Sequence, residues 1–459
     1  MTEGTPPPAG WAGRARAAWA VPREIRRALL GLALPIVGAN LLQRGVGIVD
    51  AVLVGRVGAE ALAAVGLSNL LIMFVMALVF GLGLGSTVLV AFHTGARDAA
   101  RRARAVRATL LAGAAATLVL APSGLATSRL AARLLGASGP VEDLAAAYLA
   151  IIWAGFLFKV YLQLGSSVFQ GAGDTRTPLK VLVWVNLLHV ALAWPLVFGV
   201  GGMPRLGVVG AAVGTVASEA VGAVALWAAA RRRGLLGPPG PWADRGELAG
   251  ILRVGLPTVG ERLLTQGMQL VYARLVISFG VAAYAAHQVG LNVEALSFLP
   301  GLAFAQGATA LVGQRLGAGD PEGARQAGIQ AGVVAVGVMT AFGASYWAFP
   351  ALWVSLFTAD PHVLAYGRTL LAVMAALQPP LALAMATSGA LRGAAETRVV
   401  MHAAIVGGWG LRLPVAYLGG VLAGWGLLAV WLTMILDWGA RAAITVRRFR
   451  TLRWDAVRL

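Results

Sequence analysis

The sequence predicts an all-α integral membrane protein with twelve transmembrane helices, arranged as two six-helix lobes related by a parallel pseudo-two-fold repeat. Three observations support this fold. The 459 residues are 58% hydrophobic and 12% charged, with a mean hydropathy of +0.77, whereas soluble domains are about 25% charged. Twelve apolar stretches are each long enough to cross a bilayer. The second half of the chain repeats the first half at a fixed offset.

Charge clusters separate the twelve apolar stretches. About 20 mainly apolar residues cross the hydrocarbon core as a helix. The predicted spans are residues 28–55, 60–92, 104–128, 144–171, 178–200, 207–231, 248–280, 283–315, 325–356, 363–391, 398–421 and 424–446. Several are longer than the minimum, so we expect their ends to project into water or the helices to tilt.

The basic residues predict the orientation of the spans, because cytoplasmic loops carry an excess of Lys and Arg. With the N-terminus inside, 27 of the 37 Lys and Arg lie on the cytoplasmic side, five in outer loops and five within spans. The polar, basic N-terminus lacks the short apolar core of a cleaved signal peptide. The sequence therefore predicts a multi-pass protein with both termini in the cytoplasm.

The two halves match at an offset of 222 residues. Leu34-Pro35 falls on Leu256-Pro257, GSTVLVAFHTGARD (85–98) on GATALVGQRLGAGD (307–320), and GAGDTR (171–176) on GAAETR (393–398). An even number of spans separates equivalent points, so equivalent helices point the same way. Parallel repeats occur in secondary transporters, which bind ligands near the midplane between the repeats.

The repeat and the charge clusters divide the chain into five parts. These are a cytoplasmic N-terminal tail (1–27), an N-lobe of six spans (28–231), a Pro- and Gly-rich cytoplasmic linker (232–247), a C-lobe of six spans (248–446) and a cytoplasmic C-terminal tail (447–459).

Composition and motifs exclude several classes of function. The net charge of +18 is spread in clusters between apolar runs, rather than on one solvated face as in a nucleic-acid binder. The chain has no cysteine, which excludes disulfides, thiolate metal sites and cysteine nucleophiles. It also lacks a phosphate-binding G-x-x-x-x-G-K-[ST] loop. We expect no cofactor, no bound metal and an ion gradient as the energy source.

Several segments resemble the multidrug and toxic compound extrusion (MATE) family, bacterial type. They are LPIVGANLLQRGVGIVDAVLVGRVGAEALAAVGL (34–67), QGAGDTRTP (170–178), AAHQVGLNVEALSFLPG (285–301), LRGAAETR (391–398) and GWGLLAVWLTMILDWGARAAITVRRFR (424–450). The resemblance implies a V-shaped pair of six-helix bundles around a central cavity, in a bacterial inner membrane. It also implies export of small organic compounds driven by protons or sodium ions. We expect a monomer.

Asp50 is the first candidate for ion coupling. It lies within the first span beside small and apolar residues, and an ionisable group inside a bilayer is a functional candidate by default. The resemblance places the family's N-lobe coupling carboxylate at this position. The alternative is an acid held in a salt bridge with Arg44 or Lys159.

His189 is the second ion-coupling candidate, in the fifth span. Many relatives of this family carry Asn and Asp four residues apart here, and these positions match His189 and Ala193. Sodium, as a hard cation, prefers oxygen ligands. The replacement by His and Ala therefore favours proton coupling through Asp50 and His189. The alternative is a structural histidine bonded to a backbone carbonyl.

The C-lobe offers candidates for substrate binding or for movement between the lobes. Glu261 and Glu294 lie within the seventh and eighth spans, where they either bind substrate or pair with Arg262 and Arg274. The other two candidates are Gln288 and Thr265. Some relatives use a glutamate on the seventh span and an aspartate on the tenth as a sodium site. The glutamate position falls on Thr265, and the tenth span has no acid.

Four prolines are candidate helix breaks: Pro35 and Pro257, at equivalent points of the repeat, and Pro379-Pro380 in the tenth span. Transporter helices flex or line cavities at such breaks. Outside the spans, Asp174 and Glu396 each precede a threonine at a predicted helix start, where they are expected to cap backbone N–H groups.

The sequence thus favours a secondary antiporter, not an enzyme. It would export amphipathic, cationic organic compounds in exchange for protons by alternating access. A sodium-coupled exporter of the same family and a lipid-linked saccharide flippase are the alternatives; an arginine-lined central cavity favours the flippase. A membrane enzyme acting on lipid or prenyl substrates would need paired acids or a nucleophile with its base. Neither D-D-x-x-D nor H-E-x-x-H occurs.

Overall fold

The computed structural model describes residues 23–238 and 244–457. Every regular element in these ranges is helical. The first half holds α2 (Arg23–Gly55), α3 (Ala59–Gly95), α4 (Ala99–Leu134), α5 (Pro140–Ala154), α6 (Phe156–Gly171), α7 (Arg176–Phe198), η1 (Val200–Gly202) and α8 (Val208–Arg232). The second half holds α9 (Arg245–Ile277), α10 (Val281–Gly317), α11 (Pro321–Ala348), α12 (Pro350–Ser355), α13 (Pro361–Gly393), α14 (Thr397–Ala404), η2 (Ile405–Arg412), α15 (Leu413–Val415), η3 (Ala416–Leu422), α16 (Gly426–Thr451) and η4 (Trp454–Ala456).

The observed helices are consistent with twelve spans. Among the described residues, ten helices are long and apolar enough to cross a membrane, counting Thr397–Leu422 as one. An eleventh forms if α5 and α6, bent by 56° at Gly155, make one span. The remaining predicted span is α9, which is as long as α2. It carries Glu261 and Arg262 in its middle, so its apolar content is lower.

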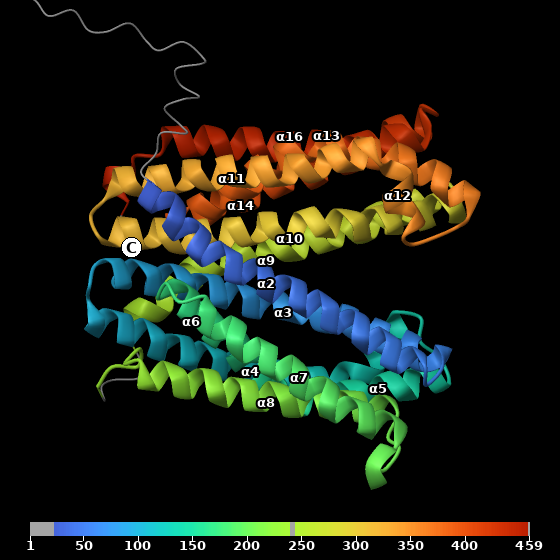
Figure 1. Ribbon diagram of the computed structural model, residues 1–459, viewed down its shortest axis with the longest axis horizontal. Helices are drawn as coiled ribbons and strands as arrows, with labels where there is room; N and C mark the ends of the chain where they lie inside the picture. Colours follow the sequence, from blue (N-terminus) through green and yellow to red (C-terminus); the bar gives the residue numbers. More distant parts are fainter. Residues whose placement is uncertain (1–22, 239–243, 458–459) are drawn as a thin grey trace, which may run out of the picture.

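The helices form two lobes (Figure 1). One apolar core is built mainly from α3–α8 and another from α10–α16. The first turns of α2 and α9 are exchanged between these cores. Leu29 of α2 is fully buried in the C-lobe core, and Ile251 of α9 is fully buried in the N-lobe core. Since 29 and 251 differ by 222, the exchange follows the repeat and ties the lobes together at one end.

The sequence repeat is visible in the contact between α3 and α10. A Cβ atom on Gly95 would overlap the backbone carbonyl of Gln314, and one on Gly317 would overlap that of Phe92. Both pairs of positions are related by the same 222-residue offset. Only glycine permits such a close approach of two backbones. The lobes are therefore locked along a symmetric seam where α3 and α10 end.

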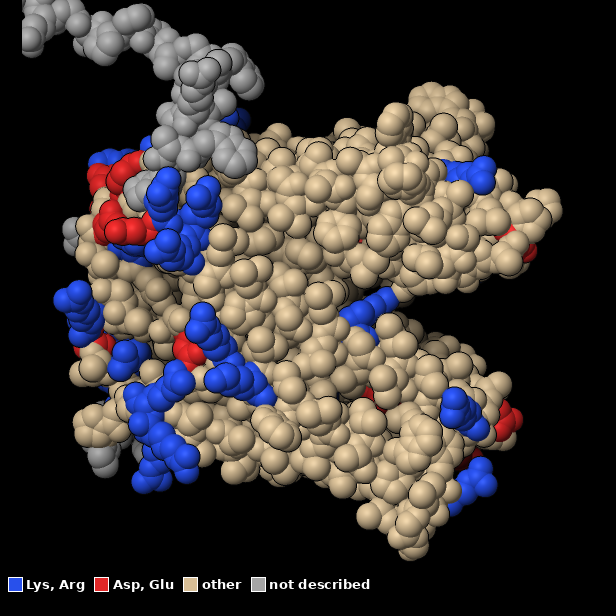
Figure 2. Space-filling model, in the orientation of Figure 1, with Lys and Arg blue, Asp and Glu red and all other residues tan. Residues whose placement is uncertain are grey.

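This seam lies at the end that the charge distribution predicts to be cytoplasmic, which we call the inner end. Figure 2 shows most basic side chains gathered there, while a cleft separates the lobes at the opposite, outer end. A pocket of about 530 Å³, which we call the cleft pocket, is lined by Gln43, Arg44, Gly47, Ile48, Ala51 and Val52 of α2, and its Arg44 hydrogen bonds to Asn292 in the other lobe. The cleft is open outward and closed inward.

The expectation that four prolines break their helices is wrong. Pro35 lies inside α2, Pro257 inside α9, and Pro379 and Pro380 inside α13. A proline removes one backbone hydrogen bond, and close neighbours in a membrane bundle can satisfy the freed carbonyl. The chain departs from regular α-helix elsewhere, at Gly155 and in the π-helical turns η2 and η3.

The tails and linker are only partly described. Residues 1–22 of the predicted N-terminal tail, 239–243 of the linker and 458–459 lie outside the described residues. Helix α8 ends at Arg232 and α9 begins at Arg245, so the linker is the connection between them. Helix α16 continues to Thr451, beyond the end predicted for the last span.

Candidate functional site

Asp50 and His189 form a direct contact inside the N-lobe. Helices α2 and α7 pack together, and the Nε2 atom of His189 lies 2.5 Å from Oδ1 of Asp50. The imidazole is buried at 4% exposure, whereas the Asp50 side chain is 31% exposed. Ala51, the next residue on α2, lines the cleft pocket. A hydrogen-bonded carboxyl and imidazole thus lie next to residues that line the pocket.

The salt bridges that were the alternative reading of Asp50 are absent from the described residues. Lys159 of α6 instead forms an ion pair with Glu219 of α8. Arg44 donates a hydrogen bond to Oδ1 of Asn292 on α10, in the other lobe. His189 contacts a carboxylate through Nε2 and also interacts with the backbone of Gly214 on α8.

Two further polar groups, Glu219 and Tyr148, lie near the Asp50–His189 pair. Glu219 is close enough to interact electrostatically with His189, and the buried Tyr148 of α5 with both Asp50 and Glu219. Ala193, one turn beyond His189, is fully buried. Ala193 packs against Gly214 of α8. Its methyl side chain has no oxygen atom that could bind a cation. Within the described residues, no group of three or more His, Cys, Asp or Glu side chains is arranged to hold a metal ion.

The candidate residues of the C-lobe do not form one site. Glu261 of α9 accepts two hydrogen bonds from Arg392 at the end of α13, at 2.6 and 2.8 Å. Its partner is therefore neither Arg262 nor Arg274. Glu294 of α10 is buried at 8% exposure, and Arg412 is the charged group that acts on it. Thr265 lies one helical turn beyond Glu261.

A buried charge cluster of the C-lobe was only partly predictable. Asp437 of α16 is fully buried and contacts Arg441 at 2.6 Å and Arg412 at 3.6 Å. The pairing with Arg441 follows from their spacing of four residues, but the participation of Arg412 does not. The guanidinium of Arg412 also lies 3.9 Å from the centre of the Tyr272 ring.

The two polar clusters occupy equivalent places in the repeat. Asp50 corresponds to Tyr272 and Glu219 corresponds to Arg441, each across 222 residues. Acids of the N-lobe are thus replaced in the C-lobe by a phenol and a guanidinium. The two lobes share a backbone plan but have different electrostatic properties.

Polar residues of α10 face α2 across the cleft. Asn292 binds Arg44 and donates its own Nδ2 hydrogen bond to the backbone oxygen of Gln288, at 3.0 Å. Gln288 is exposed and donates to the Tyr284 hydroxyl at 2.6 Å. Gln288 was a candidate from the sequence, whereas the bridge of Arg44 and Asn292 between the lobes was not predicted. A signal for this bridge was available, because Arg44 is one of five basic residues inside predicted spans.

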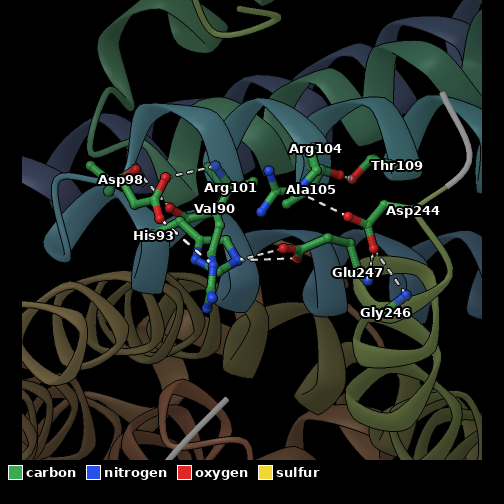
Figure 3. Close-up of polar contacts among 11 residues, drawn as sticks. Val90, His93, Asp98, Arg101, Arg104, Ala105, Thr109, Asp244, Gly246 and Glu247 are labelled. Carbon is green, nitrogen blue, oxygen red and sulfur yellow. Dashed lines mark hydrogen bonds and ion pairs between the residues drawn. The ribbon is translucent and has the colours of Figure 1, made fainter. Parts of the chain in front are cut away.

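Polar contacts join α3 and α4 to the start of α9 at the inner end (Figure 3). Nε2 of His93 on α3 lies 3.1 Å from both carboxylate oxygens of Glu247 in the first turn of α9. Arg104 of α4 forms an ion pair with Asp244 at 2.9 Å. Asp98 caps α4 by accepting a hydrogen bond from the backbone N–H of Arg101, which holds the pKa of Asp98 below its usual value. These contacts hold the start of α9, which packs in the N-lobe core, against α3 and α4.

Comparisons with known proteins agree with this architecture. A model of the MatE family matches residues 35–195 and 257–418, one segment in each lobe. The chain is 32% identical to the probable multidrug resistance protein NorM of Thermotoga maritima, covering 94% of each chain. It is 30% identical to the multidrug resistance protein PmpM of Pseudomonas aeruginosa, covering 93% of this chain and 91% of the relative.

Solved structures show the same fold. A MATE transporter of Vibrio cholerae, VcmN, superposes with a TM-score of 0.87 at 19% identity, covering 94% of this chain and 99% of the other. A multidrug resistance MATE transporter described as outward-facing superposes with a TM-score of 0.86 at 24% identity, covering 94% of this chain and 96% of the other.

Proposed function

The chain belongs to the MatE family of multidrug efflux transporters, and we propose that it is a secondary antiporter that exports amphipathic organic compounds in exchange for protons. The observation that carries the proposal is the contact between Asp50 and His189 at the edge of the cleft. A proton entering from the outer side protonates the pair, and its release on the inner side completes the exchange. Asp50 and His189 are the ion-coupling residues of this scheme.

The shape of the molecule supports alternating access. The cleft is open at the outer end, while the glycine seam between α3 and α10 closes the inner end. A substrate leaves and a proton enters in this arrangement. The reverse arrangement, with the inner end open, then takes up the next substrate from the cytoplasm in the bacterial inner membrane. We place one such pathway in each chain, acting as a monomer.

Two alternatives have less support. A sodium-coupled exporter needs several oxygen ligands for a hard cation, but His189 engages one oxygen of Asp50, and Ala193 supplies no ligand. A lipid-linked saccharide flippase would be favoured by a cavity lined with several arginines. The cleft pocket is lined by a single arginine, Arg44.

Reconstituted vesicles test the proposal. With the inner end of the protein facing the bath, an acidic lumen should drive uptake of the permanently cationic dye ethidium at equal sodium concentrations on both sides. Protein-free vesicles under the same gradient give the passive background. Full uptake driven by a sodium gradient at equal pH would favour the sodium-coupled alternative, and uptake equal to the background under both gradients would contradict the proposal.

Topology can be tested with single cysteines, because the chain has none of its own. Arg232→Cys lies in the last turn of α8, and Leu134→Cys, at a residue 79% exposed, lies at the opposite end of the molecule. An impermeant maleimide applied to intact cells should label Leu134→Cys and leave Arg232→Cys unlabelled until the cells are lysed. Labelling of Arg232→Cys in intact cells would reverse the predicted orientation.

The ion pair of Glu261 with Arg392 should affect the movement of the lobes more than the coupling. Glu261→Gln leaves Arg392 without its carboxylate, so we expect slower turnover or weaker dye binding, by several-fold. The pH dependence of the remaining transport should match that of the wild type. Glu322→Gln, which removes an exposed acid paired with Arg325, is the matched control. A shifted pH profile in Glu261→Gln would place Glu261 in the proton pathway.

A further inference from the structure

The acids and bases within the membrane are paired unevenly. Four of the acids have a cationic partner: Asp50 with His189, Glu219 with Lys159, Glu261 with Arg392, and Asp437 with Arg412 and Arg441. Glu294, the fifth, is buried near Arg412. Of these five acids, Asp50 is the most exposed, and it is paired with His189. None of the others is available to bind a cation in the cleft.

Arg44 is the opposite case, a cation without an acid. It is exposed on the wall of the cleft pocket, and no carboxylate of the described residues lies within 4.0 Å of its guanidinium. Its hydrogen-bond partner is a neutral amide oxygen, Oδ1 of Asn292. An unpaired charge at membrane depth is unfavourable unless it faces water or serves a function. Arg44 faces the cleft.

A second guanidinium has no ion pair among the described residues. Arg262 of α9 packs over the ring of Phe80 on α3, at 4.3 Å from the ring centre. The neighbouring acid, Glu261, is held by Arg392 instead. Arg262 does not line the pocket, so Arg44 is the cation there that would attract a negative group on a bound molecule.

The chemistry of Arg44 favours one kind of negative group. A guanidinium presents parallel N–H donors that match the two oxygens of a carboxylate, and such charge-assisted hydrogen bonds are stronger than those to a neutral amide. A ligand carboxylate can thus replace the Asn292 oxygen at little cost. Because Arg44 and Asn292 belong to different lobes, this replacement also releases a contact that holds the lobes together.

We propose that Arg44 binds a carboxylate of the exported compound, so that compounds with a free carboxylate bind more tightly than the matching esters. This inference rests on the proposed export function. Arg44 thereby determines specificity, and binding of the acidic group loosens the bridge between α2 and α10.

A matched pair of dyes tests the inference. Rhodamine 110 carries a free carboxylate, and rhodamine 123 is its methyl ester with the same cationic ring system. Binding to the purified full chain is measured by fluorescence polarisation without any gradient. We expect the wild type to bind the acid about tenfold more tightly than the ester. Arg44→Gln should remove this preference by weakening acid binding about tenfold and changing ester binding less than twofold, and Arg44→Lys should keep part of it.

The control and the outcomes separate this inference from the proposed function. Arg274→Gln removes an exposed arginine in the last turn of α9, outside the residues that line the pocket, and should bind both dyes as the wild type does. Retained ester binding shows that Arg44→Gln is folded. Equal weakening for both dyes, or an unchanged acid preference, would overturn the role of Arg44. If wild-type vesicles transported neither dye under a pH gradient but the purified protein still preferred the acid, the proposed export function would be contradicted. The role of Arg44 in binding a carboxylate would stand.

Discussion

Replacing Asp50 with asparagine is expected to reduce gradient-driven transport to the level of protein-free vesicles. Asparagine preserves the shape of the side chain and can still hydrogen bond to His189, but it cannot take up or release a proton. Because the other described acids in the membrane lie in closed ion pairs or are buried, none of them can take over this exchange. The measurement is dye uptake into vesicles with an acidic lumen.

The matched control for Asp50 is an acid of the same type outside the cleft. Asp143→Asn alters an exposed carboxylate that pairs with Arg129 on the surface, and its uptake should equal that of the wild type. His189→Gln should keep some uptake but change its pH dependence, since the partner of the carboxylate is lost. If Asp50→Asn retained its uptake and its pH dependence, proton coupling would have to occur at another residue.

The spans and the repeat were predictable because they depend on patterns that are local or periodic. Apolar length determines where a helix can cross the membrane, and a fixed offset links Gly95 to Gly317 without knowledge of the structure. The sequence alone also predicts that Asp50 lies within a span. These features follow from the order of the residues alone.

The pairing of charges across helices could not be predicted in the same way. Lys159 pairs with Glu219, 60 positions away, and Arg392 with Glu261, 131 positions away. Which partner is chosen depends on how each helix is rotated about its axis, and hydropathy does not determine this. The Asp437–Arg441 pair is of a kind that spacing can indicate, because four residues of one helix place both side chains on the same face.

The two acids at helix starts show how context changes a local rule. Asp174 was predicted to cap α7, and its carboxylate accepts hydrogen bonds from the backbone N–H groups of Arg176 and Thr177. Glu396 lies at the equivalent position before α14 but makes no capping hydrogen bond. Its longer side chain binds Arg448 of α16 instead. The cap prediction is confirmed in one lobe and wrong in the other.

Replacing Asp437 with asparagine is the second large effect we expect, on stability rather than on coupling. Asp437 is fully buried, and the side chains of Arg412 and Arg441 beside it are 6% and 7% exposed. Removing the carboxylate leaves two guanidinium groups buried without a counter-charge. Breaking a buried ion pair from one side typically costs about 3–5 kcal/mol. The measurement is the melting temperature of the purified protein in detergent, which should fall markedly.

A surface acid and a double variant give the controls for Asp437. Asp455→Asn removes a carboxylate that is 69% exposed and 3.7 Å from Arg453, so its melting temperature should stay close to that of the wild type. Replacing Arg441 with methionine in the Asp437→Asn background should restore part of the lost stability, because one uncompensated charge is removed. A wild-type melting temperature in Asp437→Asn would show that water reaches this cluster.

The contrast between Asp437 and Asp50 explains why we assign them different roles. Both are carboxylates inside a bundle and both touch a basic side chain. Asp437 is fully buried between two guanidinium groups, which keep their protons at all physiological pH values. Asp50 is 31% exposed beside the cleft and faces an imidazole, the side chain whose charge changes most readily near neutral pH. Folded Asp437→Asn molecules should therefore transport with the pH dependence of the wild type, and this is the measurement that separates a structural charge from a coupling one.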